Sequence, residues 1–282
     1  MPYRSLKTRE VLSFIGLTLL LLGLSGAIQP SHAAELAEIE QRGYLIVGVK
    51  DNLRPLGFTN EAGELEGLEI DLAHWLAERI LGDAEAVVFQ PLANQERLSA
   101  LLEDEVDLVV ARLTFTTSRS RLVDFSQPYY FDGTALITQN SSLQRLSDLR
   151  HQPIAVLHDS DTIATVRFQI PTARLVGVGS YEEAKALLET GQAVAFAADA
   201  SVLTGWVQEY PSYRLLPVLL SAEALAVGLP RGLQYDSLRR QVNRAIEQWR
   251  TEGRLQERVQ HWGLPSVGVP SQIEGNWEEP ER

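Results

Sequence analysis

Short apolar runs alternate along this chain with segments in which apolar residues recur every three or four positions. The run Tyr44–Val49 is rich in β-forming residues and predicts a strand, whereas segment 68–82 has helical periodicity and ends at a glycine. Segment 238–249 has the same periodicity, and Ser180 with Glu183 forms the pattern of a capping box before another helix. Strands that alternate with helices in this way predict an α/β fold.

One pattern occurs twice. Segment 100–111 resembles segment 186–197, since both read as a helix end, a turn and a buried strand. The first strand runs into Arg112, and the second runs into Asp199. Two similar units predict two lobes of related construction. Because open α/β sheets bind ligands at the carboxyl ends of their strands, we expect both strand ends to face one shared cleft.

The end of the first strand is rich in hydroxyl groups and guanidinium groups, in the stretch "ARLTFTTSRSRLVDFSQPYY". Arg119 there suits bidentate binding of a carboxylate, and Thr114 adds a hydroxyl and a backbone N–H. Asp199 suits an ammonium group, so the three together fit an α-amino acid. The alternative is that the hydroxyls at 116–118 cap a helix and that Arg119 is solvated or pairs with Asp124.

Composition narrows the class of protein. The chain of 282 residues carries 25 basic and 37 acidic side chains, a formal net charge of −12, which argues against a nucleic-acid partner. The chain contains no cysteine, so no disulfide contributes to its stability. Its histidines are scattered, and we expect no metal site.

The N-terminus has the pattern of a secretory signal peptide. Three basic residues precede the apolar run Val11–Leu24, and Ser31 and Ala33 are small residues suited to cleavage. We therefore expect residues 1–33 to be removed and the mature protein to be soluble in a bacterial periplasm. The alternative is an uncleaved anchor helix.

Four stretches give the chain a family resemblance. They are "GYLIVGVKDNLRPLGF", "GELEGLEIDLAHWLA", "VDLVVARLTFTTSRSRLVDFSQPYY" and "HWGLP". Between Leu36 and Pro265 the chain resembles the family 3 extracellular solute-binding proteins, the polar amino-acid receptors of ABC importers. The resemblance implies a periplasmic-binding-protein-like fold of type II, with two α/β lobes joined by two hinge strands. It implies lobe 1 at 34–131 and 225–265, lobe 2 at 132–224, and a flexible tail at 266–282.

The resemblance also assigns binding roles. Arg119 matches the arginine that binds the ligand's α-carboxylate, Thr114 the residue that assists it, and Asp199 the acid that binds the α-ammonium. Asp51 falls at the mouth of the site. Ser160 falls on the carboxylate-binding loop, although its neighbour Asp161 replaces a usual threonine.

The ligand class that the resemblance implies depends on the basic residues that are not assigned to the α-carboxylate. Lys50 and Arg97 match basic residues that meet the side-chain carboxylate in aspartate and glutamate receptors. The alternatives are a surface lysine at Lys50 and a helix-surface salt bridge at Arg97. Arg112 stands where the family often has a small residue, and contacts either the ligand or the cleft wall and hinge. Asn94 stands where other receptors have a stacking aromatic.

The sequence therefore predicts a monomeric periplasmic receptor that binds an amino acid without catalysis or cofactors and delivers it to an ABC permease. Glutamate or aspartate is the expected ligand, and glutamine or asparagine the alternative. Two other classes stay open: a cyclohexadienyl dehydratase-like enzyme on the same scaffold, and a sensor that reports the ligand to a membrane partner.

Overall fold

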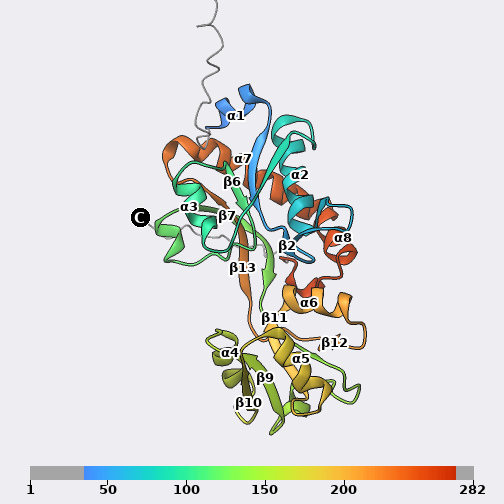
Figure 1. Cartoon of the computed structure of the whole chain (residues 1–282). Coiled ribbons are helices and arrows are strands. Elements are labelled where there is room, and N and C mark those ends of the chain that lie inside the picture. Colours follow the sequence, from blue (N-terminus) through green and yellow to red (C-terminus); the bar gives the residue numbers. More distant parts are fainter. Residues whose placement is uncertain (1–34, 271–282) are drawn as a thin grey trace, which may run out of the picture. The chain divides into compact units, whose positions relative to one another are not determined.

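Each long strand of the fold sends alternate side chains to opposite faces of a sheet, and both faces are covered by helices. A computed structural model describes residues 35–270 (Figure 1). The predicted signal peptide and the last twelve residues of the predicted tail lie outside the described residues. Within them, no helix is long and apolar enough to cross a membrane.

The first sheet has five strands in the order β5-β1-β6-β13-β7. They are β5 (Val87–Pro91), β1 (Leu45–Val49), β6 (Leu108–Val110), β13 (Glu223–Leu229) and β7 (Asp124–Asp132). The strands β5, β1 and β6 are parallel, and β13 runs antiparallel to both β6 and β7. The two ends of the described chain therefore build one sheet together.

Helices cover both faces of this sheet. They are α1 (Leu36–Arg42), α2 (Leu68–Leu81), α3 (Glu96–Leu102), α7 (Asp236–Thr251) and α8 (Arg254–His261). Val47 of β1 packs in one core cluster with α2, α7 and α8, whereas Ile46 packs against the cluster that includes α3 residues. The helices predicted for 68–82 and 238–249 are confirmed as α2 and α7.

The second sheet has the order β10-β9-β11-β8-β12. Its strands are β10 (Arg174–Val178), β9 (Pro153–Leu157), β11 (Ala195–Asp199), β8 (Thr134–Thr138) and β12 (Arg214–Leu215). Phe196 packs with α5 (Tyr181–Glu189) and α6 (Ala200–Glu209), and Ala197 packs with α4 (Thr162–Gln169) on the other face. The repeated helix–strand pattern is confirmed, with one copy in each sheet.

The predicted capping box at α5 forms only in part. The Ser180 hydroxyl accepts a hydrogen bond from the Glu183 N–H, as predicted. The Glu183 carboxylate, however, accepts from the Gly179 N–H instead of that of Ser180. The prediction was therefore wrong about the second hydrogen bond, because Glu183 reaches one residue further back.

Two segments connect the sheets. The chain leaves the first sheet after β7, enters β8 through Gly133, and returns between β12 and β13. The segments are hydrogen bonded to each other: the Thr134 N–H donates to Ser221 Oγ, and the Leu220 N–H donates to the Thr134 carbonyl. A Cβ at Gly133 would lie 2.0 Å from the Ser221 carbonyl oxygen, so the close approach requires glycine.

The remaining elements are short. A small antiparallel sheet contains β2 (Asn52–Leu53), β3 (Gly57–Thr59) and β4 (Leu65–Glu66). Four 3₁₀ turns are described: η1 (Arg119–Arg121), η2 (Leu146–Leu149), η3 (Leu233–Tyr235) and η4 (Ser266–Gly268). The first of these places Arg119 beside the end of β6.

Candidate functional site

Strand ends from both sheets line one small cavity, of about 200 Å³. The first sheet contributes the segment after β6, and the second contributes the ends of β9 and β11. The polar lining residues are Arg97, Arg112, Thr114, Arg119, Ser160, Asp161, Thr162, Tyr181, Asp199 and Glu223. The expected shared cleft is confirmed by this cavity, whose volume suits a ligand smaller than a typical drug.

Two arginines make one side of the cavity cationic. Arg119 donates from Nη1 to the Thr114 carbonyl at 2.9 Å. Arg97 donates from Nη1 to the carbonyls of Ala111, at 2.9 Å, and Arg112, at 2.8 Å. Burial, followed by the guanidiniums of Arg119 and Arg112, lowers the pKa of Arg97. A ligand carboxylate between Arg97 and Arg119 would relieve this repulsion.

The cavity lining also contains three acidic residues. Asp199 ends β11, Glu223 begins β13, and Asp161 precedes α4. Burial raises the pKa of Asp199, and Asp132 and Asp161 add to the effect while Arg112 opposes it. Burial and the nearby Asp199 likewise raise the pKa of Glu223. A cationic group of a ligand would be stabilised here.

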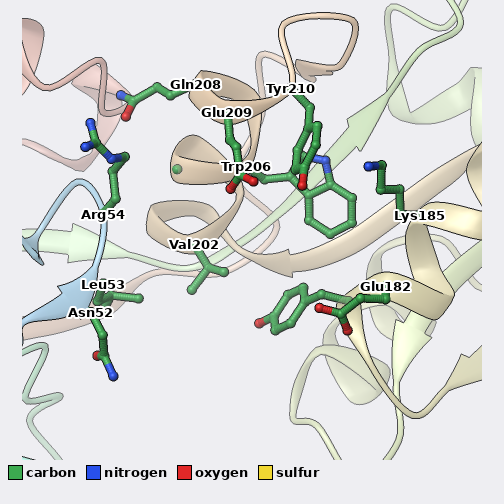
Figure 2. Close-up of a pocket in the computed structure, with 12 residues that line it drawn as sticks. Asn52, Leu53, Arg54, Glu182, Lys185, Val202, Trp206, Gln208, Glu209 and Tyr210 are labelled. Atoms are coloured by element: carbon green, nitrogen blue, oxygen red, sulfur yellow. The ribbon is translucent and has the colours of Figure 1, made fainter. Parts of the chain in front are cut away.

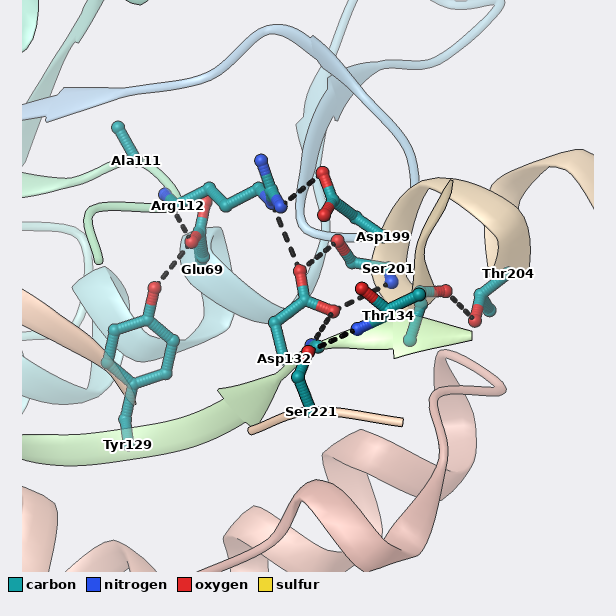
Figure 3. A network of polar contacts seen from close by, with 12 residues as sticks. Glu69, Ala111, Arg112, Tyr129, Asp132, Thr134, Asp199, Ser201, Thr204 and Ser221 are labelled. Carbon is teal, nitrogen blue, oxygen red and sulfur yellow. Dashed lines mark hydrogen bonds and ion pairs between the residues drawn. The ribbon is translucent and has the colours of Figure 1, made fainter. Parts of the chain in front are cut away.

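Arg112 lies between two carboxylates (Figure 3). Its Nε is 3.0 Å from Asp132 Oδ2, and its Nη2 is 2.5 Å from Asp199 Oδ2. Burial opposes the charge of Arg112, but attraction by Asp132 and Asp199 outweighs burial and raises its pKa. The Asp199 carboxylate is therefore already paired with a cation of the protein itself.

The loop before α4 supplies hydroxyl groups to the same cavity. Ser160 Oγ is buried and has no hydrogen-bond partner among the described residues. Thr162 is the first residue of α4, whose N-terminal N–H groups favour an anion. Asp161, which replaces the usual threonine of this loop, also lines the cavity.

Two predicted site residues lie apart from this lining. Lys50 and Asp51 follow β1 but are not among the residues that line the cavity. Lys50 is only 6% exposed, and its Nζ donates to the Leu92 carbonyl at 2.8 Å. The alternative of a surface lysine is thus wrong, because burial against the segment after β5 gives the ammonium an internal partner.

The alternatives proposed for two arginines also differ from the structure. Arg97 forms no helix-surface salt bridge among the described residues, because its guanidinium donates to backbone carbonyls instead. Among the described residues, Arg119 does not pair with Asp124, because its Nη1 donates to the Thr114 carbonyl. Arg119 lies within the 3₁₀ turn η1.

The sequence pattern did not reveal four residues of the site. Glu223 and Tyr181 line the cavity. Glu69 accepts a hydrogen bond from the Arg112 N–H, and Asp132 accepts one from Arg112 Nε. The sequence did contain a signal for Asp132 and Glu223, since each is an acidic residue at one end of an apolar strand. Glu69 reads as an ordinary first-turn residue of α2, so its contact with Arg112, 43 residues later, follows only from the fold.

A second cavity, of about 620 Å³, is larger than the first (Figure 2). It is lined by the β2 end, α5 and α6, including Asn52, Arg54, Lys185, Trp206 and Tyr210. Tyr181 lines both cavities. In the second, Lys185 lies over the ring of Tyr210 and Arg54 lies over the ring of Phe58, so both cations already have protein partners. Within residues 35–270, no cluster of three or more potential ligand side chains could hold a metal ion.

Comparison with known proteins identifies the family. Residues 45–265 match the family model of the bacterial extracellular solute-binding proteins, family 3, and the chain belongs to this family. It is 32% identical to a glutamine-binding protein of Geobacillus stearothermophilus over 68% of this chain and 75% of the relative. It is 25% identical to the glutamate-binding protein GluB of Corynebacterium glutamicum over 86% of this chain and 85% of the relative.

A solved structure shows the same fold. It is that of the ancestral amino acid-binding protein AncCDT-1, described as a precursor of cyclohexadienyl dehydratase, with a TM-score of 0.60 and 26% identity. The similarity covers 81% of this chain and 99% of that one. The fold is therefore the type II periplasmic-binding-protein fold, with two α/β lobes joined by two hinge strands, and the chain is an amino-acid-binding protein of the ABC-transporter class.

Proposed function

We propose that this protein captures an acidic L-amino acid, glutamate before aspartate, between its lobes in the periplasm and delivers it to an ABC permease. We assign lobe 1 to residues 34–131 and 225–265 and lobe 2 to residues 132–224. The observation that carries the proposal is that Arg97, Arg119 and Asp199 line the same small cavity. The α-carboxylate would bind Arg119, Thr114 and Ser160, and the α-ammonium would bind Asp199.

The preference for an acidic side chain rests on Arg97. Its Nη2 has no hydrogen-bond partner among the described residues, while Nη1 and Nε are held by backbone carbonyls. A half-buried guanidinium held in this way is positioned for a ligand carboxylate, which must be paired to be buried. Glutamine is the alternative ligand, because its amide oxygen accepts from the same donor at a smaller desolvation cost.

The first test is binding of the common amino acids by calorimetry. Glutamate is expected to bind most tightly, and lysine and arginine most weakly. Arg119→Ala should lose about 2–5 kcal/mol of binding free energy, roughly a thirty-fold to several-thousand-fold loss of affinity, because a buried carboxylate loses its partner. Unchanged affinity in Arg119→Ala, or arginine as the tightest ligand, would contradict the proposal.

A second test addresses side-chain recognition. Arg97→Gln should reduce the ratio of glutamate affinity to glutamine affinity, because the variant lacks the charge that favours a carboxylate. Lys50→Met is the comparison, since its ammonium is bound to Leu92 and does not line the cavity. A ratio that responds to Lys50→Met but not to Arg97→Gln would reverse the assignment.

The enzyme alternative is supported by the likeness to a dehydratase precursor and by Glu223, a cavity acid with a raised pKa. Incubation with arogenate distinguishes the two functions. A binding protein forms no phenylalanine, whereas turnover that is lost in Glu223→Gln would establish the enzyme.

A further inference from the structure

Three charged side chains connect the two sheets (Figure 3), and two of them, Arg112 and Asp199, line the cavity. Arg112 follows β6 in the first sheet, Asp132 ends β7 at the crossing between sheets, and Asp199 ends β11 in the second. The guanidinium contacts both carboxylates, at 3.0 Å and 2.5 Å. The three groups carry one positive and two negative charges, so one negative charge remains for a ligand cation.

The two carboxylates differ in what they can reach. Asp132 is fully buried and accepts four hydrogen bonds, from Arg112 Nε, the Gly133 N–H, and the N–H and hydroxyl of Ser201. The Asp199 side chain is 32% exposed, lines the cavity and is paired only with Arg112 among the described residues. Asp132 therefore anchors the guanidinium, and Asp199 is the carboxylate that faces the ligand.

The backbone of Arg112 is held in a conformation that side-chain-bearing residues seldom adopt. Its φ is +47°, in the left-handed region, which costs about 1–2 kcal/mol for a non-glycine residue. Its N–H donates to Glu69 Oε1 at 2.6 Å, and its carbonyl accepts from Arg97 Nη1. Strain maintained by buried partners indicates that the direction of this side chain is needed.

We propose that Arg112 is the positioning residue for ammonium recognition: fixed by Asp132, its guanidinium orients the Asp199 carboxylate and keeps it charged for the ligand's amine. This inference rests on the proposed function, in which Asp199 binds the α-ammonium. Arg112 acts through Asp199, so its contribution is distinct from that of Arg119, which contacts the ligand itself.

The charges around Asp199 give this role a measurable signature. The charged and titratable groups that line the cavity with Asp199 are Arg97, Arg112, Arg119, Asp161, Tyr181 and Glu223, and the buried Asp132 also acts on it. Arg112 is the cation in contact with Asp199, and it counteracts burial and the neighbouring acids, which raise the pKa of Asp199. Without Arg112 the carboxyl would take up a proton at a higher pH, and a neutral Asp199 binds an ammonium weakly.

The experiment compares Arg112→Gln with wild type by calorimetric titration of L-glutamate between pH 5.5 and 7.5, where both carboxylates and the ammonium of the ligand stay charged. At pH 7 the affinity of Arg112→Gln should fall about tenfold to a hundredfold, as when the partner that orients a binding group is removed. Its affinity should also begin to fall at a higher pH than that of wild type. Arg121→Gln is the matched control, because it removes an exposed arginine outside the cavity lining.

A second variant distinguishes charge from geometry. Arg112→Lys keeps the charge but cannot bridge two carboxylates, so it should bind more weakly than wild type with a nearly unchanged pH profile. A uniform loss in Arg112→Gln at every pH, or wild-type affinity in Arg112→Lys, would overturn the inference. If Arg112→Gln does not fold, the Arg112→Lys result decides. Absence of amino-acid binding in wild type would instead refute the proposed function.

Discussion

A single buried carboxyl group, that of Glu69, fixes the backbone at the centre of the site. Its Oε1 accepts from the Arg112 N–H at 2.6 Å and from the Tyr129 hydroxyl at 2.5 Å. Burial raises its pKa above the ordinary value of 4.5, and the hydrogen bonds from Tyr129 and Arg112 only partly offset burial. The ionised form of Glu69 is therefore disfavoured in the folded protein.

This pKa shift predicts a pH-dependent stability. Because the folded pKa exceeds the unfolded one, the contribution of Glu69 to stability is fully present below pH 4.5 and is lost as the pH rises through the folded value. Wild type should therefore lose stability relative to Glu69→Gln as the pH rises. Urea unfolding at pH 5 and pH 8 measures the difference, and the exposed Glu61→Gln serves as the control. An equal difference at both pH values would contradict the prediction.

Residue types at strand ends predicted much of the cavity from the sequence. Arg119, Thr114 and Asp199 line it because the segment after β6 and the end of β11 meet there, where Arg112 contacts Asp199, as the repeated pattern implied. Lys50 could not be excluded in this way, since a residue after a strand is free to turn toward the cavity or toward a backbone carbonyl. The choice depends on the Leu92 carbonyl, which lies 42 residues away in sequence.

Long periodic elements were predictable, and short ones were not. The apolar stripes of α2 and α7 extend over several turns, whereas β2, β3 and β4 have two or three residues each and leave no periodic pattern. The packing of α6 could not be predicted from the sequence either. Gly205 reads as a weak helix residue, yet a Cβ there would lie 2.4 Å from the Arg54 carbonyl oxygen beyond β2.

The helix α6 therefore provides a test at the level of elements. Gly205→Ala improves helix propensity by roughly 1 kcal/mol but clashes with the backbone of the first lobe. Because two crossing segments join the lobes within residues 35–270, we expect the clash to be relieved by separation of the lobes rather than by unfolding. Thermal stability should change little, while glutamate affinity should fall about tenfold if opening is favoured by roughly 1.4 kcal/mol.

Gly179→Ala is the matched control for this experiment. A Cβ at Gly179 would make only an ordinary contact, 3.6 Å from Glu183 Oε2. Its affinity for glutamate should remain that of wild type. A lower melting temperature with unchanged affinity in Gly205→Ala would show that the α6 contact supports the fold and not the bound state.

At the scale of the molecule, the cavity is the place where a ligand can connect two separately built cores. Each sheet has its own core clusters, and the crossing segments and the Arg112–Asp199 pair lie between them. In the proposed function, Arg119 of one lobe and Asp199 of the other hold the ligand, which therefore favours the state in which the two lobes are close. The internal repeat in the sequence predicted this division into two lobes, because one copy of the helix–strand unit lies in each sheet.

This arrangement predicts that ligand stabilisation requires Asp199. Glutamate at one hundred times its dissociation constant should stabilise wild type by about 2.7 kcal/mol, which for a chain of this size raises the melting temperature by roughly 5–11 °C. Asp199→Asn keeps the shape of the side chain but lacks the charge for the ammonium, so its shift at the same glutamate concentration should be far smaller. Glutarate, which has no amine, should give wild type a similarly small shift. Calorimetric scans of both proteins with both compounds measure these shifts in melting temperature. Equal shifts for glutamate and glutarate in wild type would show that Asp199 does not bind the amine.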